Sequence, residues 1–140
     1  MKREYPIHPL VGVGMVVMKG DQIVLVKRER EPGKGKWSIP GGMLELGEKI
    51  SDGVKREVLE ETGLRVEIDR LIDVEENIGR DDAGKIRFHY VLVDYLGHVV
   101  GGRLQPDTDV KEAIWVNLSD IDSFYITNTL KRLLIKAKLK

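Results

Sequence analysis

Apolar residues recur along the 140-residue chain with the spacing of strands in some stretches and of helices in others. Five stretches have the apolar, β-branched or alternating pattern that predicts strands: 11–18, 22–27, 65–75, 86–95 and 113–116. The first two are separated by Lys19-Gly20-Asp21, which is typical of a turn, so they predict a hairpin. Residues 77–85 and 99–111 are polar and predict connecting segments.

A closing helix is predicted at residues 128–139. Its apolar side chains share one face, at Leu130, Leu133, Leu134 and Ala137, and its lysines lie on the other. This pattern favours a helix that packs on the sheet with a solvated lysine face, rather than a basic helix that recognises nucleic acid.

A second helix is predicted at residues 50–62. Gly63 suits the left-handed position that ends a helix, whereas the start is less clearly marked, with Ser51 as one candidate cap. Gly53 inside the helix costs roughly 1 kcal/mol of helix propensity, or else it permits close packing.

Carboxylates occupy one face of this predicted helix. Glu57, Glu60 and Glu61 are spaced i, i+3 and i+4, and two of them continue the apolar line that starts with Ile50 and Val54. Like charges four residues apart oppose helix formation by roughly 0.2–0.5 kcal/mol per pair. A hard divalent cation would neutralise such a group, because Mg²⁺ takes carboxylate oxygens together with substrate phosphates. A solvated acidic face is the alternative, and this spacing alone favours it.

The segment before this helix is basic and rich in glycine. Residues 27–36 (KREREPGKGK) form either a solvated loop or a loop that faces phosphate, with Arg28 as the preferred phosphate contact. The segment runs into Gly41-Gly42, where the absence of side chains lets the backbone approach a ligand closely.

Composition narrows the function classes. Lysine plus arginine and aspartate plus glutamate number 23 each, so no net charge points to nucleic acid or a membrane. There is no cysteine, which excludes disulfides, thiolate metal sites and a cysteine nucleophile. The N-terminus lacks an apolar signal core and no apolar run approaches ~18 residues, so we expect a single cytoplasmic domain over residues 1–140.

Residues 42–64 (GMLELGEKISDGVKREVLEETGL) resemble the signature of the Nudix hydrolases at every defining position. The resemblance favours the metal-binding interpretation of the acidic face. It implies an α/β fold, an α/β/α sandwich with a mixed β-sheet. It also implies a Mg²⁺- or Mn²⁺-dependent enzyme that hydrolyses the diphosphate bond of a nucleoside diphosphate linked to another moiety.

The resemblance assigns roles to individual residues by their position in the signature. Glu60 and Glu61 are the principal metal ligands, and Glu57 is a further ligand or the general base. Arg56 would orient these carboxylates by ion pairing, and Glu48 would support the loop or the metal shell. The backbone carbonyl of Gly42 is a further metal ligand.

An acidic residue before the Trp-containing strand often approaches the metals or activates water in this family. Glu112 fits that role best by its place before Ile114-Trp115-Val116, although the acids here, including Asp107 and Asp109, could equally be solvated turn residues. His89 is expected to be an ordinary strand residue, since nothing pairs it with a nucleophile.

The substrate is less well defined. The sequence lacks a proline marker that is frequent in ADP-ribose-cleaving relatives, because Arg80-Asp81 stands there, yet HYVLVDY followed by Gly101-Gly102 looks like small relatives that cleave ADP-ribose or nucleotide sugars. The alternative is a MutT-type nucleoside triphosphate pyrophosphohydrolase. A non-catalytic nucleotide-binding module is disfavoured, because such modules usually lose a signature carboxylate. Many relatives dimerise, so a homodimer is one expected state.

Overall fold

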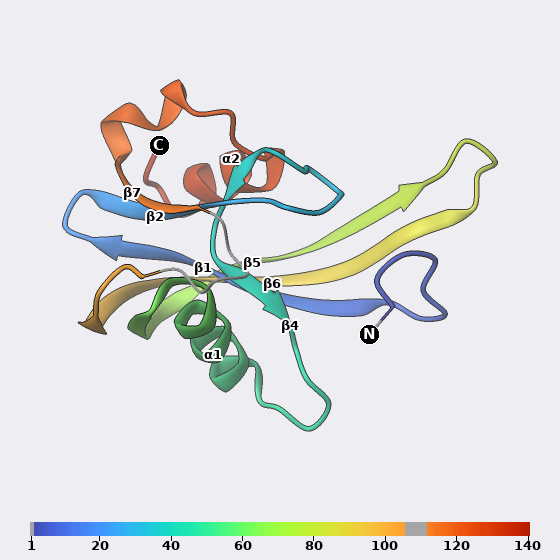
Figure 1. The fold of residues 1–140 in the computed structure, drawn as a ribbon, viewed down its shortest axis with the longest axis horizontal. Helices are drawn as coiled ribbons and strands as arrows, with labels where there is room; N and C mark the ends of the chain where they lie inside the picture. Colours follow the sequence, from blue (N-terminus) through green and yellow to red (C-terminus); the bar gives the residue numbers. More distant parts are fainter. Residues whose placement is uncertain (1, 106–111) are drawn as a thin grey trace.

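The computed structural model describes residues 2–105 and 112–140. Its strands are β1 (Leu10–Lys19), β2 (Gln22–Lys27), β3 (Trp37–Ser38), β4 (Gly41–Met43), β5 (Leu64–Arg80), β6 (Ile86–Gly102) and β7 (Ala113–Asn117). Its helices are α1 (Ile50–Thr62), the 3-10 helix η1 (Leu118–Ser123) and α2 (Asn128–Lys136), and Figure 1 shows their arrangement.

The strands form one mixed sheet. Its main order is β3-β2-β1-β6-β5, while β4 pairs with β1 and β7 pairs with β2. The β1–β6 pairing is parallel, and each of the other pairings is antiparallel. The predicted β1–β2 hairpin is confirmed, with Met18 opposite Ile23.

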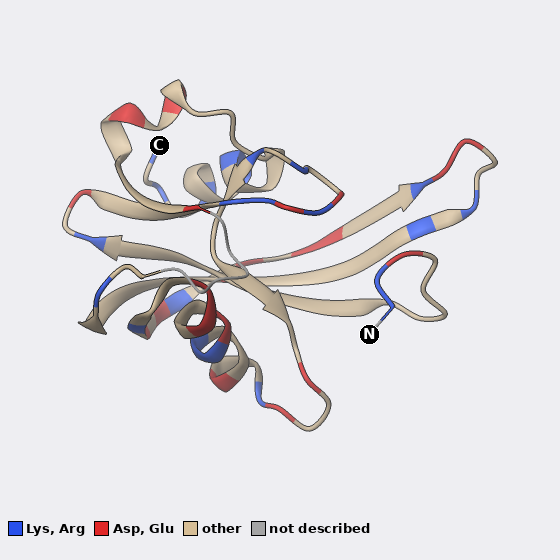
Figure 2. Cartoon of the chain, in the orientation of Figure 1, with Lys and Arg blue, Asp and Glu red and all other residues tan. Residues whose placement is uncertain are grey.

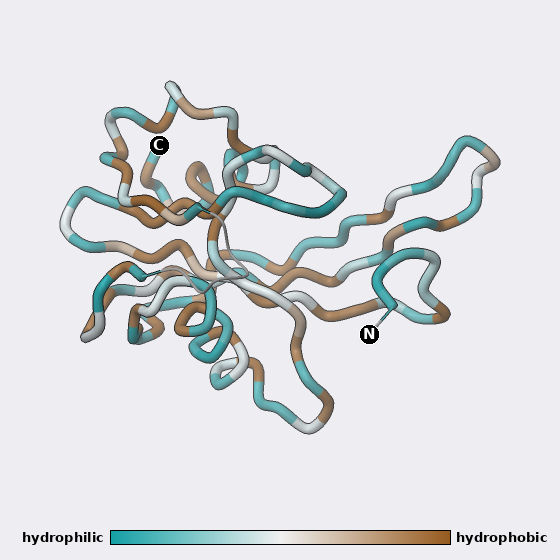
Figure 3. Tube along the Cα trace, viewed as in Figure 1, coloured by the Kyte–Doolittle hydropathy of each residue, from teal (hydrophilic) through white to brown (hydrophobic). Residues whose placement is uncertain are grey.

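The sheet separates two apolar cores. The core on one side includes Val13, Met15 and Val17 of β1, and α1 contributes Val54 and Val58. Side chains at alternate positions of β1 enter the second core, where α2 contributes three leucines. In Figure 3 apolar residues are concentrated along the central strands, and apolar and polar residues alternate along α1. The predicted α/β/α sandwich is therefore confirmed.

Helix α1 has the predicted bounds. Its N-cap is Lys49, which makes no side-chain capping hydrogen bond, so the candidate Ser51 is not the cap. Gly63 ends the helix in the left-handed conformation, with φ of 78°. Gly53 permits close packing, because a Cβ there would lie 2.8 Å from both Leu44 Cδ1 and Glu48 Oε1.

Strands β5 and β6 are longer than predicted and project as an arm at the right of Figure 1. Pairing continues through Ile78 and His89 to Arg80 and Ile86, so only the tip of the expected 77–85 loop is a turn. At the other end, the pairing of β6 reaches Gly102 instead of stopping before residue 99. Polar side chains that face solvent from a paired strand have the same composition as loop residues, which is why the sequence pattern predicts these segments as loops. Helix α2 ends at Lys136, three residues early, and its predicted apolar face is buried.

No helix in the described ranges is long and apolar enough to cross a membrane.

Candidate active site

Two adjacent glycines bring β4 against both β1 and α1. A Cβ on Gly41 would lie 2.2 Å from the Val13 carbonyl oxygen. A Cβ on Gly42 would lie 2.2 Å from Glu57 Oε2. The Gly-Gly pair therefore lies against the backbone of β1 at Gly41, where only glycine fits, and against the Glu57 carboxylate at Gly42.

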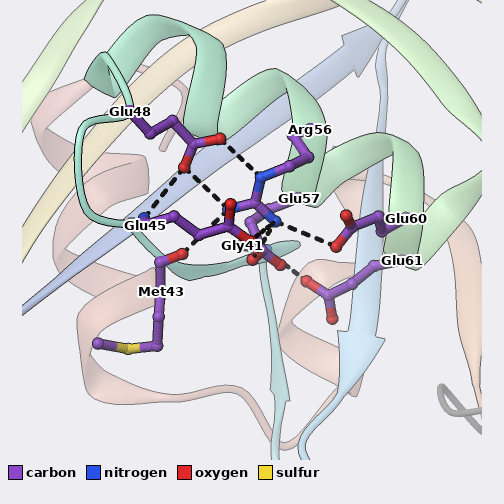
Figure 4. A network of polar contacts seen from close by, with 8 residues as sticks. All are labelled: Gly41, Met43, Glu45, Glu48, Arg56, Glu57, Glu60 and Glu61. Atoms are coloured by element: carbon purple, nitrogen blue, oxygen red, sulfur yellow. Dashed lines mark hydrogen bonds and ion pairs between the residues drawn. The ribbon is translucent and has the colours of Figure 1, made fainter. Parts of the chain in front are cut away.

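Arg56 connects the acids of this region, as Figure 4 shows. Its Nε and Nη2 donate to Glu48 at 2.7 and 3.0 Å, and Nη2 also donates to the Met43 carbonyl oxygen at 3.1 Å. Its Nη1 donates to Glu57 at 2.8 Å and to Glu60 at 3.1 Å. One guanidinium group thus orients three glutamates, because its planar donors point in fixed directions.

Glu48 is the carboxylate that Arg56 binds most completely. Hydrogen bonds from Arg56, followed in size by the hydrogen bond with Glu45, hold the pKa of Glu48 at about 2. Glu48 Oε1 also accepts the Glu45 backbone N–H at 3.1 Å, which closes the loop before α1. Glu48 is therefore a permanently charged anchor for Arg56 and the loop.

Glu57 and Glu61 lie in a drier environment. Burial raises the pKa of Glu57, and the hydrogen bond from Arg56 opposes that shift. Burial raises the pKa of Glu61 to about 7, against the opposing effect of the Gly41 N–H, which donates to Glu61 Oε1 at 2.6 Å. With a pKa of about 7, Glu61 can exchange a proton for a cation near neutral pH.

Two arginines from other parts of the chain contribute positive charge near Glu61. Arg28 is largely buried, which lowers its pKa, and its Nε donates to the Pro32 carbonyl oxygen at 2.6 Å. The charges of Arg28 and Arg3 both oppose the raised pKa of Glu61. Arg3 was missed in the sequence because nothing local connects the N-terminal lead-in with α1.

Glu112 lies apart from this network. Its side chain is half exposed and its Oε1 lies 3.8 Å from Lys27 Nζ, while its backbone carbonyl accepts the Lys27 N–H at 3.1 Å. A catalytic role for Glu112 stays a prediction. Asp107 and Asp109 lie outside the described residues.

The residues at this site fit a hard divalent cation. Glu57, Glu60 and Glu61 offer carboxylate oxygens, the Gly42 backbone lies against Glu57, and burial disfavours an uncompensated charge on Glu61. Within residues 2–105 and 112–140, no three acidic or histidine side chains already converge as ligands. Arg56 and the Gly41 N–H occupy some of these oxygens, so cation binding requires the side chains to rotate.

Comparison with known proteins identifies the class. A family model described as the NUDIX domain matches residues 8–136. The chain therefore belongs to the Nudix hydrolase family. Members of this family generally use divalent metals and act on small nucleotide substrates.

Similar proteins include ADP-ribose pyrophosphatases and a MutT NUDIX hydrolase. The chain is 36% identical over 115 residues to an ADP-ribose pyrophosphatase from Methanocaldococcus jannaschii, covering 82% of this chain and 66% of that protein. It resembles the crystal structure of a MutT NUDIX hydrolase from Burkholderia pseudomallei, with a TM-score of 0.79, 30% identity, and coverage of 92% of this chain and 98% of the other. An ADP-ribose pyrophosphatase from Streptococcus suis gives a TM-score of 0.66, with 26% identity and coverage of 95% and 94%.

The chain spans 66% or less of the length of the first curated relatives that it matches.

Proposed function

We propose that this chain is a Mg²⁺- or Mn²⁺-dependent hydrolase of the diphosphate bond in a nucleoside diphosphate linked to another moiety, with ADP-ribose or a nucleotide sugar as substrate. The observation that carries the proposal is the half-buried Glu61 carboxylate, which accepts the Gly41 N–H, beside Glu57 at Gly42. Removing an acid from solvent in this way costs stability, whereas a cation that carries diphosphate would use it.

The proposed division of labour follows the site geometry. Glu57, Glu60, Glu61 and the Gly42 carbonyl hold the cation, which when bound polarises the diphosphate and favours deprotonation of water. Arg56 keeps Glu57 and Glu60 oriented. In the reaction, a water oxygen forms a bond to phosphorus, the bridging P–O bond breaks, and a carboxylate of the site accepts the water proton.

Arg28 is the proposed phosphate contact. Its guanidinium is largely buried and lies close enough to Glu61 for their charges to interact. A cation in that place would bind the non-bridging oxygens of a diphosphate that is also held by the metal. Glu112, at the end of the segment before β7, is the proposed second acid that approaches the water.

The relatives favour ADP-ribose as the substrate. The Methanocaldococcus jannaschii relative carries that activity in its name, and its 36% identity extends over 82% of this chain. The second candidate is nucleoside triphosphate hydrolysis of the MutT type, which the similarity to the Burkholderia pseudomallei structure supports.

A substrate panel with Mg²⁺ tests this proposal. We expect release of AMP and ribose 5-phosphate from ADP-ribose, with slower hydrolysis of nucleoside triphosphates and no turnover in excess chelator. Pyrophosphate release from triphosphates at the highest kcat/KM would instead favour the MutT-type activity. Full activity in chelator would contradict the metal-dependent mechanism itself.

Glu61→Gln supplies the matched variant. It removes a charged metal ligand while keeping the side-chain volume, so we expect kcat/KM to fall by at least about 10³-fold. Glu67→Gln is the control, because Glu67 is exposed and pairs only with Lys55, at 3.1 Å, among the described residues. Undiminished turnover by Glu61→Gln would remove Glu61 from the mechanism.

A further inference from the structure

The loop that connects β2 with β3, residues 28–36, is folded around its first residue, Arg28. The Arg28 N–H donates to the Lys36 carbonyl oxygen at 2.9 Å, and the Arg28 carbonyl oxygen accepts the Gly35 N–H at 2.8 Å. The side chain turns back on the same loop, where its Nε donates to the Pro32 carbonyl oxygen at 2.6 Å. The loop therefore fixes both the backbone and the side chain of Arg28.

Arg28 differs from the other charged residues of this loop, on which Figure 2 shows both signs of charge. Arg30 and Lys34 are exposed, whereas Arg28 is partly buried. Its Nη1 and Nη2 form no hydrogen bond or salt bridge within residues 2–105 and 112–140. Two parallel N–H donors of a guanidinium group match two oxygens of one phosphate. The loop thus holds one guanidinium group in place and leaves its outer donors to a ligand.

Strand pairing brings this loop toward the carboxylates of α1. One edge of β1 pairs with β6, so β2 and β4 share the other edge, β2 at Met18–Lys19 and β4 at Gly12–Gly14. Because β2 is antiparallel to β1, its end, which Arg28 follows, points toward the part of β1 that pairs with β4. Strand β4 in turn carries Gly41, whose N–H donates to Glu61. The direction of the strands therefore links Arg28 with the candidate active site independently of charge.

Gly33 lies against the side chain of Arg28. A Cβ on Gly33 would lie 3.3 Å from Arg28 Cδ, 3.4 Å from Arg28 Nε and 3.5 Å from Thr127 Cγ2. The added methyl group would therefore stand between Arg28 and Thr127. Carbon atoms in contact prefer a separation of about 3.5–4.0 Å, so a neighbour of this methyl group would have to move by a few tenths of an ångström.

Thr127 is the more firmly held of these two neighbours. Its N–H donates to the Trp37 carbonyl oxygen at 3.0 Å. Its Oγ1 accepts the Leu130 N–H at 3.2 Å, as the N-cap of α2. The Arg28 side chain is held by a single hydrogen bond, so an alanine at position 33 would displace the guanidinium group of Arg28 rather than Thr127.

Gly35 provides a matched position in the same loop. Gly33 and Gly35 are both left-handed, with φ of 81° and 86°, so alanine is strained to a similar degree at either position. A Cβ on Gly35, however, would meet no atom within 4 Å. Only at Gly33 does the added methyl group press on Arg28.

We propose that Gly33 is a positioning residue for the reaction, because the absence of a side chain there lets the loop hold the Arg28 guanidinium where it binds the diphosphate of the substrate. The inference rests on the proposed function, in which Arg28 is the phosphate contact, and it applies to both candidate substrates, since both contain a diphosphate. Gly33 itself touches no substrate and acts only through Arg28. A displaced guanidinium group presents its two donors less well to one phosphate, which weakens the contact in the transition state.

A double-mutant cycle with ADP-ribose and Mg²⁺ tests this role. We expect Gly33→Ala to lower kcat/KM about tenfold and the control Gly35→Ala to lower it by less than about twofold. Arg28→Ala should lower it about 100-fold, because charge-assisted hydrogen bonds to phosphate are lost. In the Arg28→Ala background, Gly33→Ala should have no more effect than Gly35→Ala has alone. A general disturbance of the loop would instead persist in the double variant, and a tenfold loss there would overturn the proposal.

A binding measurement separates this inference from the proposed activity. Methylenediphosphonate, a diphosphate analogue whose P–C–P bridge is not hydrolysed, is titrated into each protein in Mg²⁺ by calorimetry. We expect its affinity to fall about tenfold in Gly33→Ala and about 100-fold in Arg28→Ala, and to be retained in Gly35→Ala. If the affinities follow this order but the protein does not cleave ADP-ribose, the activity proposal fails and the positioning role stands.

Two other results would overturn the positioning role. If Arg28→Ala weakens binding and turnover while Gly33→Ala behaves like Gly35→Ala, the proposed function stands without a role for Gly33. If Arg28→Ala changes neither binding nor turnover, the phosphate contact in the proposed function is wrong, and the positioning role fails with it.

Discussion

Acidic side chains gather on both sides of the sheet, but they are neutralised in different ways. On the α1 side, one guanidinium group, that of Arg56, donates to Glu48, Glu57 and Glu60, while Glu61 accepts a hydrogen bond from the Gly41 backbone N–H. Figure 4 shows these acids gathered around Arg56.

On the α2 side the acids come from strands and the cations from the helix. Arg132 donates to both oxygens of Glu75, at 3.0 and 3.1 Å, and Lys136 pairs with Asp73 and lies 3.6 Å from Glu75. These pairs join residues at least 57 positions apart in sequence and fasten α2 to β5.

The difference distinguishes a candidate functional site beside α1 from a salt-bridge network beside α2 that stabilises the fold. Beside α1, carboxylate oxygens remain that can coordinate a divalent ion. Beside α2, Arg132 and Lys136 pair with Glu75 and Asp73, so these two acids are not expected to coordinate a metal. We therefore expect changes on the α1 side to affect turnover and matched changes on the α2 side to affect stability.

Replacing the arginine on each side gives the largest expected difference. Arg56→Gln should lower kcat/KM by about 100-fold, since Glu57 and Glu60 lose the group that orients them. Arg132→Gln should leave kcat within twofold and reduce the free energy of unfolding by about 1 kcal/mol, because the pair with Glu75 is partly exposed. Steady-state kinetics and urea unfolding of both variants test this. If Arg56→Gln and Arg132→Gln lost turnover equally, the α1 side could not be distinguished from the α2 side as the catalytic one.

The pH dependence of metal binding gives the next largest effect. A ligand must lose its proton to bind a cation, and the pKa of Glu61 is raised to about 7 by burial. Mg²⁺ affinity should therefore rise by up to about tenfold per pH unit below pH 7 and level off above it. In Glu61→Gln this dependence should flatten. Calorimetric titrations with Mg²⁺ at pH 6, 7 and 8 measure it, and a flat wild-type profile would contradict the assignment.

The two sides also differ in how much their sequence reveals. The carboxylate face of α1 could be predicted because i, i+3 and i+4 spacing fixes which side chains share a helix face, and Gly63 marks where the helix ends. The network on the α2 side depends on pairings that bring Asp73 opposite Asp94, which no local pattern encodes.

The sequence does contain one signal for the α2 side. Asp94 interrupts the apolar run YVLVDYL, and its partner in register on β1 is Gly14, within the run VGVGMVV. A Cβ on Gly14 would lie 2.7 Å from Asp94 Oδ1, so the glycine makes room for the acid. An isolated acid and an isolated glycine in two apolar strands together indicate a buried polar contact.

Asp94 gives the prediction with the smallest expected effect, which tests whether the α2 side is independent of the metal site on the α1 side. It is 5% exposed, and its Oδ2 has no hydrogen-bond partner among the described residues. Burial, followed by the charges of Glu75 and Asp73, raises its pKa to about 7. Arg132 and Lys136 pair with those two acids, and no cation of the described residues forms a salt bridge with Asp94.

The raised pKa determines the sign of the effect on stability. A carboxyl whose pKa is higher in the folded than in the unfolded protein contributes stability below about pH 4, and that stability is lost as the pH rises through 7. Asp94→Asn does not titrate, so its free energy of unfolding relative to wild type should increase by roughly 1–3 kcal/mol between pH 5 and pH 8. Urea unfolding in chelator measures this, with Asp82→Asn on the exposed arm tip as the control.

Glu61 titrates in the same pH range as Asp94, so it also lowers the stability of the protein as the pH rises. Adding Mg²⁺ should restore the stability that is lost through Glu61, both in the wild type and in Asp94→Asn. The stability that is lost through Asp94 should not change when the metal is added. A gain in Asp94→Asn that disappeared on adding Mg²⁺ would mean that Asp94 takes part in the metal site, and that the two sides of the sheet are not independent.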